Sequence, residues 1–320
     1  MTPGPMGLKY AYTSPLRPVG GVSEVEVRPP FPYRLPSYGG EDGVMRVQRG
    51  VATRLLQVEG CPVLTRAWEA GKGRVTLRAE PLDPGSIAAP SPAAGVPARE
   101  AGPAELELAL ERMRFALGVD DDLGEFYRRF RGDPLLGPLL RRRPHLRPRR
   151  RPWPWEALAW AVVKQLIESG RAARIQRRMV GRWGVRLGPR REGLHDVPTP
   201  DLIAGRAPVE LESMGLALKR AIALRAVAAD VAAGRCDPGE PVADERLLAV
   251  REIGPWTVQC LGLFGRGDPD ALPAGDLMYL KQVGRLARLG RRATVEEVEE
   301  FYAPYAPFRG LAATWSTIAA

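Results

Sequence analysis

The stretch Val250-Arg251-Glu252-Ile253-Gly254-Pro255-Trp256-Thr257-Val258 decides the fold of this chain. An apolar helical pattern runs into its start, and Gly254 allows a tight turn. Pro255 suits the first position of a second helix, because its missing N–H would be unpaired there in any case. Eighteen residues after Val258, Asp276 lies inside the turn Leu272-Pro273-Ala274-Gly275-Asp276-Leu277. The sequence therefore predicts a helix-hairpin-helix, followed by a Pro-x-Gly-Asp turn that opens a further helix.

The composition is typical of a globular protein with a polyanionic partner. The 320 residues are enough for two domains and a sizeable core, and the hydrophobic content of 45% argues against a disordered chain. The net charge of +10 favours nucleic acid as the partner, with an anionic membrane surface as the alternative.

Cysteine and histidine usage narrows the chemistry. Cys61, Cys236 and Cys260 never form a C-x-x-C pair, which argues against a zinc site or an iron–sulfur cluster. His145 and His195 are the only histidines, so we expect no histidine-based triad and no metal cage. We therefore expect no metal and no other cofactor, and any catalysis has to rest on carboxylates.

No segment has the character of a targeting signal or a membrane span. Met1–Pro5 shows no basic region followed by an apolar core, and the longest strictly apolar run, Ala157–Val163, is too short to cross a bilayer. Together with the basic charge, these features lead us to expect a cytoplasmic, nucleoid-associated protein.

The pattern of the chain changes near residue 103. Between Val22 and Glu80, short alternating stretches separated by glycines and prolines are typical of β-strands. Pro81–Pro103 is rich in Pro, Ala and Gly, which is typical of a linker. We therefore predict an α+β protein with a β-rich α+β domain and linker over residues 1–103 and an all-α domain over residues 104–320.

Helical periodicity and capping residues predict the elements of the second domain. Asp276 and Thr294 stand where helices open, and Thr294 forms a capping-box pattern with Glu297. The predicted helices are Ala104–Leu117, Leu123–Phe130, Pro154–Val180, Thr199–Ile203, Pro208–Met214, Leu218–Ala233, Asp244–Val250, Pro255–Phe264, Asp276–Leu289 and Val295–Phe301.

The hairpin and the Pro-x-Gly-Asp turn resemble those of the helix-hairpin-helix-GPD superfamily of DNA glycosylases. The Gly-Pro-Trp-Thr sequence of the hairpin is most similar to the 3-methyladenine DNA glycosylase II branch. The resemblance extends over Pro154–Leu158, Lys164–Leu166, Leu211–Leu216 and Phe308–Trp315. It implies a cleft between two helical lobes in the all-α domain. It also implies a monomer whose partner is double-stranded DNA with damaged bases.

The resemblance implies a monofunctional DNA glycosylase of base excision repair that flips out alkylated purines of the 3-methyladenine and 7-methylguanine type. Members that also cut the strand carry a lysine on the second helix of the hairpin, where the amine can form a Schiff base with the sugar. Trp256 stands at that position here, and Lys281 lies five positions beyond Asp276, rotated away from it. Two alternatives stay open: a glycosylase for oxidised or deaminated bases, and a non-catalytic DNA-binding protein.

Asp276 is the candidate catalytic residue. Cleavage of an N-glycosidic bond passes through a sugar with oxocarbenium character, which a carboxylate beside the anomeric carbon stabilises while it orients or deprotonates water. A base that alkylation has made cationic leaves without a separate general acid. The alternative role for Asp276, that of a helix cap, is compatible with catalysis.

The resemblance also assigns a base pocket. Trp256 matches an aromatic position that lines the pocket in related enzymes, where an aromatic face suits a cationic base. Trp315 in the last helix is a second candidate, and Cys260 and Ser316 stand where other members carry further aromatics. The alternative for both tryptophans is ordinary core packing.

Two regions are candidates for DNA contact. The first is Gln165 and Leu166: Leu166 resembles the apolar wedge that fills the gap left by a flipped nucleotide, although a buried helix position is the alternative. The hairpin residues Ile253, Gly254 and Thr257 resemble a phosphate site, where backbone N–H groups meet the anion. Arg309 completes the predicted contacts.

The chain departs from the family pattern at Glu252, which stands where a glycine is usual and adds a negative charge beside the expected phosphate. The arginine-rich stretch Arg141–Pro152 is too interrupted by proline to form a helix. Its arginines either track phosphates or form a solvated loop.

Overall fold

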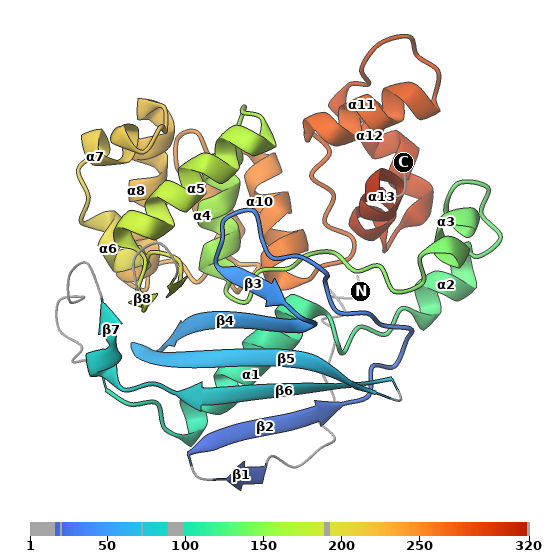
Figure 1. Ribbon diagram of the computed structural model, residues 1–320. Helices are drawn as coiled ribbons and strands as arrows, with labels where there is room; N and C mark the ends of the chain where they lie inside the picture. The colour runs from blue at the N-terminus through green and yellow to red at the C-terminus, as the bar shows by residue number, and fades with distance from the viewer. Residues whose placement is uncertain (1–16, 20, 72, 89–98, 189–192, 319–320) are drawn as a thin grey trace.

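The computed structural model describes residues 17–19, 21–71, 73–88, 99–188 and 193–318, and Figure 1 gives the arrangement of its helices and strands. Met1–Pro5 and residues 89–98 of the expected linker lie outside the described residues. Within the described part of the chain, no helix combines the length and the apolar character that a bilayer crossing requires.

A six-stranded antiparallel sheet forms the N-terminal part of the molecule. The two-residue turns Arg49-Gly50 and Glu59-Gly60 have positive φ at both positions, as type I′ hairpins require, and they fix the register of the strands they join. Strands are thus confirmed in the alternating region. In spatial order they are β1 (Arg17–Val19), β2 (Val22–Val27), β6 (Arg74–Pro81), β5 (Cys61–Gly71), β4 (Val51–Val58) and β3 (Met45–Gln48).

Helix α1 (Pro103–Leu117) packs against this sheet. Its residues Leu106, Leu110 and Met113 are buried in one apolar cluster with Val63 and Leu77 of the strands. The composition changes at residue 103, but the helix that begins there shares its core with the strands before it. The domain boundary at residue 103 therefore stays a prediction.

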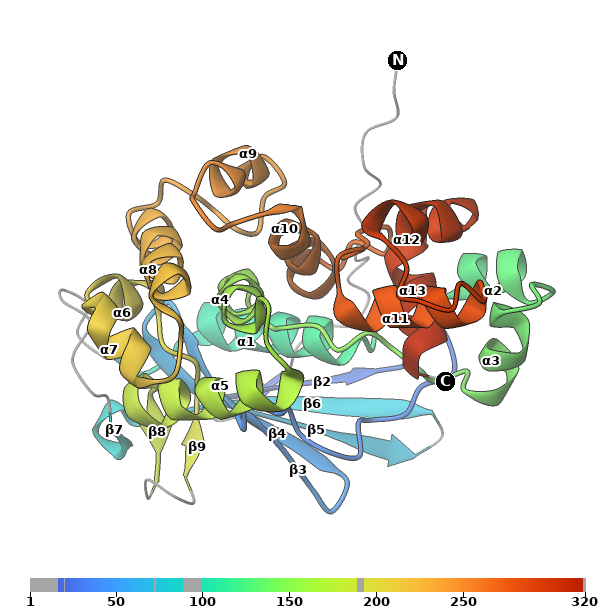
Figure 2. The same cartoon turned by 90° about the horizontal axis from the view of Figure 1, so that it is seen from above.

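The remaining helices bury two further apolar clusters, which we call the central lobe and the C-terminal lobe (Figures 1 and 2). The central lobe contains α4 (Pro154–Lys164), α5 (Ser169–Trp183), α6 (Pro200–Ala204), α7 (Pro208–Ser213), α8 (Leu218–Ala232), α9 (Ala243–Leu248) and α10 (Pro255–Leu261). The C-terminal lobe contains α2 (Gly124–Phe130), α3 (Leu136–Arg142), α11 (Leu277–Leu286), α12 (Val295–Tyr302) and α13 (Arg309–Ile318). Helices and an antiparallel sheet together confirm the α+β class.

Short elements complete the fold. A π-helical turn, Gly262–Arg266, continues α10. Single 3-10 turns lie at Pro84–Ser86 and Ala303–Tyr305. A small sheet joins β7 (Ile87–Ala88), β8 (Arg186–Leu187) and β9 (Leu194–His195).

The prediction of one continuous helix over Pro154–Val180 is wrong. The segment forms two helices, α4 and α5, because the chain leaves the helical conformation after Lys164 and Leu166 adopts a φ of +54°. Two helix caps are confirmed. The Asp276 side chain accepts a hydrogen bond from the Met278 N–H, and Thr294 forms the expected capping box with Glu297.

A buried network of charges joins the sheet to α4. Arg54 of β4 pairs with Glu156 of α4 at 2.6 Å and with Asp196 at 3.3 Å. Arg151 pairs with the same Glu156 at 3.0 Å and also with Asp42. Because charges removed from water have to be paired, this network fixes the position of α4, and with it the residues at its C-terminal end.

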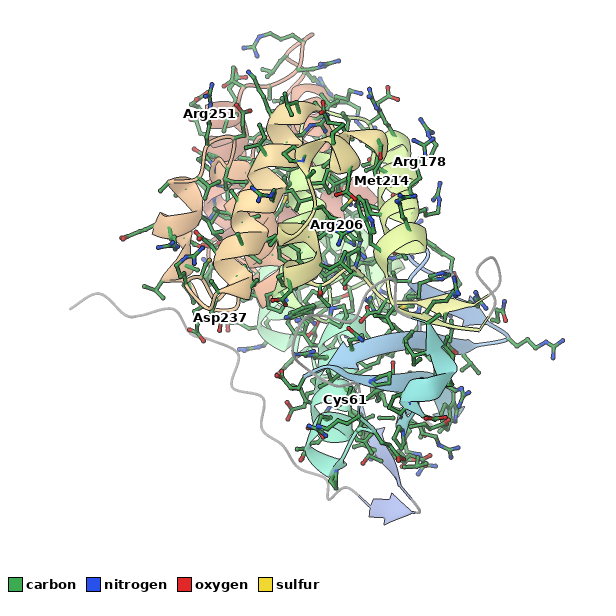
Figure 3. All side chains as sticks on the ribbon, turned by 90° about the vertical axis from the view of Figure 1, so that its left-hand side faces the viewer. Cys61, Arg178, Arg206, Met214, Asp237 and Arg251 are labelled. Atoms are coloured by element: carbon green, nitrogen blue, oxygen red, sulfur yellow. The ribbon has the colours of Figure 1, made fainter. Side chains whose placement is uncertain are left out.

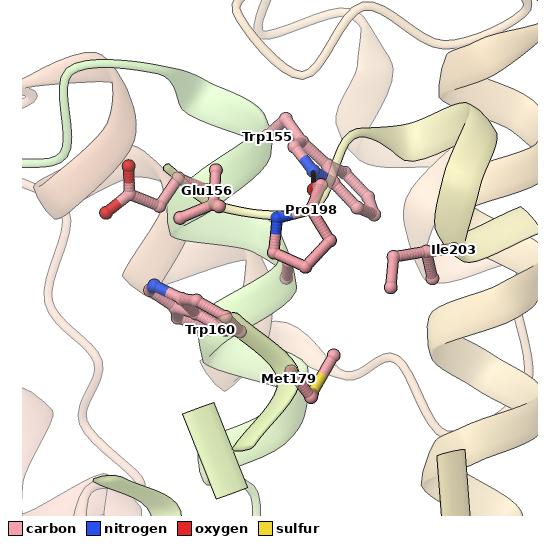
Figure 4. Close-up of a pocket in the computed structure, with 8 residues that line it drawn as sticks. Trp155, Glu156, Trp160, Met179, Pro198 and Ile203 are labelled. Carbon is pink, nitrogen blue, oxygen red and sulfur yellow. Dashed lines mark hydrogen bonds between the residues drawn. The ribbon is translucent and has the colours of Figure 1, made fainter. Parts of the chain in front are cut away.

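An interior cavity lies beside this network (Figure 4). Trp155, Glu156, Trp160 and Ile203 are among the residues that line it, and its volume of about 10 Å³ is at most that of one water molecule. It is too small for a nucleobase and belongs to the core.

Candidate active site and nucleic-acid interface

Asp276 lies immediately before α11 and caps it. Its Oδ1 accepts a hydrogen bond of 2.9 Å from the Met278 N–H, and its own N–H donates to the Pro273 carbonyl at 2.8 Å. Within the described residues, Oδ2 has no hydrogen-bond donor, and the side chain is only half-buried. One carboxylate oxygen is therefore held by the helix while the other can face a ligand.

Trp256 packs beside the turn that carries Asp276. A Cβ atom added to Gly275 would lie 3.7 Å from the indole Cδ1 of Trp256, so the ring lies directly against this glycine. The ring is half-buried, and its Nε1 has no hydrogen-bond partner among the described residues. The structure thus brings the hairpin helix α10 and the Pro-x-Gly-Asp turn together.

Cys260 lies one helical turn after Trp256, on the same side of α10. It is buried, and burial is the main reason why the pKa of its thiol is raised well above the usual value. The Asp276 carboxylate raises this pKa further and the Lys164 ammonium lowers it. Both charges therefore lie within electrostatic reach of the same sulfur.

Lys164 is a residue that sequence reasoning missed. It ends α4 and is partly buried, and burial, followed by the charge of Arg151, lowers the pKa of its ammonium. It forms no ion pair within the described residues. In the sequence it is a single lysine at the end of an apolar helix, and only the packing of α4 against α10 brings it near Cys260.

Trp315 and Ser316 lie in the core of the C-terminal lobe. Trp315 is fully buried, with its ring centroid 6.2 Å from that of Phe126 and 5.9 Å from that of Tyr127. The Ser316 hydroxyl lies 2.7 Å from the Tyr302 hydroxyl and donates to the Ala313 carbonyl at 2.8 Å. These contacts agree with core packing, and the pocket role of both residues stays a prediction.

Among the described residues, Leu166 is the most exposed large apolar side chain. Its exposed fraction is 101%, which rules out the buried helix position considered as the alternative. It lies in the turn between α4 and α5. This exposure agrees with the wedge role, which stays a prediction.

The hairpin presents its backbone at the start of α10. A Cβ atom on Gly254 would meet no atom within 4 Å, so the approach to this backbone is open. Ile253 and Thr257 are buried, and their N–H groups donate to the Val250 and Gly254 carbonyls at 3.0 Å, so phosphate contact by either residue stays a prediction. Glu252 has a φ of +72°, a left-handed conformation that explains why glycine is the usual residue there. Arg251 is largely exposed and lies at the upper left in Figure 3.

The side chains of two other predicted DNA-contact residues, Arg309 and Gln165, form hydrogen bonds within the protein. The Arg309 guanidinium forms a two-fold pair with Asp270, at 2.9 Å from Nε and 2.6 Å from Nη2. Gln165 donates its side-chain Nε2 to the Glu252 carbonyl at 2.8 Å and to the Thr257 hydroxyl at 2.9 Å. Direct DNA contact by either side chain stays a prediction.

The second half of the arginine-rich stretch is engaged inside the molecule. Arg150 pairs with Asp121, and Arg151 pairs with Asp42. The Arg149 guanidinium lies 3.8 Å from the ring centroid of Tyr38, which is cation–π geometry. These three arginines therefore hold the loop in place, although Arg149 is exposed, as are Arg141, Arg142 and Arg143.

A second basic surface lies at the far end of α11. Gly284 lets the following loop approach closely, since a Cβ there would lie 2.2 Å from the Arg291 carbonyl. The exposed cations of this surface surround an open hollow of about 400 Å³ and are Lys281, Arg285, Arg288, Arg291 and Arg292.

Comparison with known proteins finds relatives that are named as DNA repair enzymes, although no family model matches the chain. The chain is 26% identical over 182 residues to the DNA-3-methyladenine glycosylase of Bacillus subtilis, which covers 55% of this chain and 60% of that protein. It is 32% identical over 178 residues to a probable bifunctional transcriptional activator/DNA repair enzyme AlkA of Mycobacterium tuberculosis, covering 54% of this chain and 35% of that protein. The matched region thus spans less than two thirds of either relative.

A solved structure shares the fold over almost the whole chain. The 3-methyladenine DNA glycosylase from Archaeoglobus fulgidus superposes with a TM-score of 0.71 at 20% sequence identity, covering 92% of this chain and 97% of that one. The sheet and both helical lobes are therefore part of one known architecture.

Proposed function

The chain belongs to the helix-hairpin-helix-GPD superfamily of DNA glycosylases, in its 3-methyladenine DNA glycosylase II branch, and from this premise we propose that it is a monofunctional glycosylase of base excision repair. Its substrates are alkylated purines of the 3-methyladenine and 7-methylguanine type in double-stranded DNA. The observation that carries the proposal is the position of Asp276, with one unengaged carboxylate oxygen, beside Trp256 of the hairpin.

In the proposed mechanism a monomer binds the duplex through the hairpin backbone, and Leu166 replaces the damaged nucleotide in the stack. The base enters a cleft between the two helical lobes and stacks on Trp256. The C1′–N bond then breaks with its electron pair on the base, and the Asp276 carboxylate stabilises the positive charge on the sugar. Water adds to C1′ and loses a proton, which leaves an abasic site.

The lesion range tests this proposal. An aromatic pocket without a general acid accelerates only the loss of bases that are already good leaving groups. The cationic bases 3-methyladenine and 7-methylguanine are therefore expected to be released faster than neutral 8-oxoguanine. Replacement of Trp256 by alanine is expected to narrow that gap by about 2- to 30-fold, since cation–π attraction is worth roughly 0.5–2 kcal/mol. Single-turnover release from matched duplexes measures both effects. A preference for 8-oxoguanine would refute the proposal in favour of a glycosylase for oxidised bases.

Strand cleavage is a second test. With Trp256 at the hairpin position of the lysine, borohydride is expected to trap no covalent protein–DNA adduct, and the abasic product should break only after alkali. Denaturing gels of the borohydride-treated reaction measure this. Efficient trapping would contradict the monofunctional assignment, and the variants Lys164→Met and Lys281→Met would then identify the reacting amine.

A further inference from the structure

The turn that displays Leu166 has an unfavourable backbone for its sequence. Gln165 has φ −50° and ψ 130°, Leu166 has φ +54°, and the Ile167 N–H donates to the Lys164 carbonyl at 3.4 Å. These features describe a type II turn, whose third position favours glycine or asparagine because φ is positive there. A leucine at this position adds backbone strain to the cost of an exposed apolar side chain.

Two side chains hold this turn through hydrogen bonds. The Gln165 amide donates to the Glu252 carbonyl and to the buried Thr257 hydroxyl, at 2.8 and 2.9 Å. Arg220 of α8 donates to the Gln165 carbonyl at 2.8 Å and to the Val163 carbonyl at 3.3 Å. Glu252, whose carbonyl accepts one of these hydrogen bonds, also has a left-handed backbone conformation. The side chain of Gln165 therefore links the strained backbone at Leu166 to the strained backbone at Glu252.

We propose that Gln165 and Arg220 are positioning residues, which lock the Leu166 wedge to the hairpin so that both engage DNA as one rigid body. The inference rests on the proposed function, because it assigns a role to residues outside the chemistry. Phosphate contact at the hairpin then fixes where Leu166 enters the stack. Gln165 acts through Leu166 and contributes little to the affinity for DNA.

The first test replaces the wedge and its lock separately. Leu166→Gly is expected to leave the melting temperature unchanged or higher, because glycine relieves the strained turn, yet to slow single-turnover release of 7-methylguanine. Gln165→Leu, which keeps the size and loses the donors, is expected to slow it as well. We expect reductions of about 10- to 100-fold, the scale of a misplacement near 1 Å, with duplex Kd changed less than about threefold.

A double variant distinguishes positioning from a general structural effect. If Gln165 acts through Leu166, the Gln165→Leu, Leu166→Gly double variant should be no slower than Leu166→Gly alone. Gln259→Leu, on the same helix α10 and without a side-chain hydrogen bond in the described structure, is the matched control and should release the base at the wild-type rate.

Base extrusion provides a readout that does not depend on chemistry. The fluorescence of 2-aminopurine placed next to an abasic analogue should increase on binding of the wild type or of Gln259→Leu. The increase should be smaller with Leu166→Gly and with Gln165→Leu. Full brightening with Leu166→Gly, or additive losses in the double variant, would overturn the inference. If the wild-type protein increases 2-aminopurine fluorescence but releases no alkylated base, the proposed function is refuted. The inference that Gln165 and Arg220 position Leu166 would still stand.

Discussion

Replacement of Asp276 by asparagine is expected to slow base release on the order of 100- to 1,000-fold, the scale seen when one stabilising group for transition-state charge is removed. The amide keeps the size of the side chain but loses the charge that faces the sugar. Asparagine is as good an N-cap as aspartate, so its oxygen can still accept the Met278 N–H and α11 should keep its start. Single-turnover kinetics at saturating protein measure the loss.

The control separates catalysis from a general effect of charge. Asp122→Asn makes the same change near the start of α2, where Asp122 accepts the Gly124 N–H at 2.8 Å. That variant should release the base at the wild-type rate, and both variants should keep the melting temperature and duplex affinity of the wild type. Near-normal turnover of Asp276→Asn would remove this residue from the mechanism.

The elements around Asp276 could be predicted because their signals are local. Pro255 at a helix start, Gly254 before it and Asp276 as a cap each act on their own few residues, so the sequence reports them directly. The alternating strands are predictable for the same reason, since their side chains point alternately to either face of the sheet. The distance between hairpin and Pro-x-Gly-Asp turn then indicated which residues would meet.

The break between α4 and α5 could not be predicted in the same way. The residues from Lys164 to Glu168 include neither glycine nor proline, although Ser169 and Gly170 follow, and the apolar pattern is helical. The break depends on hydrogen bonds from Gln165 to Glu252 and Thr257, about ninety positions later in the chain. Tertiary contacts of this kind override local propensity and leave no signal in the segment itself.

The same limit applies to charged side chains. Arg309 looks like a free cation in the sequence, but Asp270, which lies 39 positions earlier, occupies its guanidinium. Arg150 and Arg151 are part of an arginine-rich run, yet they are held by Asp121 and Asp42. A run of charged residues therefore predicts the electrostatic field around the protein better than it predicts which side chains are available to DNA.

Glu156→Leu is expected to reduce the free energy of unfolding by about 3–5 kcal/mol, because it leaves the buried Arg54 with only the Asp196 carboxylate, at 3.3 Å. Burial raises the pKa of the Glu156 carboxyl, and the neighbouring Arg54 and Arg151 oppose that rise. Urea denaturation followed by circular dichroism measures the loss through its midpoint.

A surface pair provides the comparison for this last prediction. Glu80→Leu removes the partner of Arg66, which lies 2.5 Å away but is 39% exposed, and should cost no more than about 1 kcal/mol. Equal losses from the two variants would contradict the view that the buried network fixes α4. A larger loss from Glu156→Leu is the expected result, and it would show that the buried network stabilises α4, which ends at Lys164.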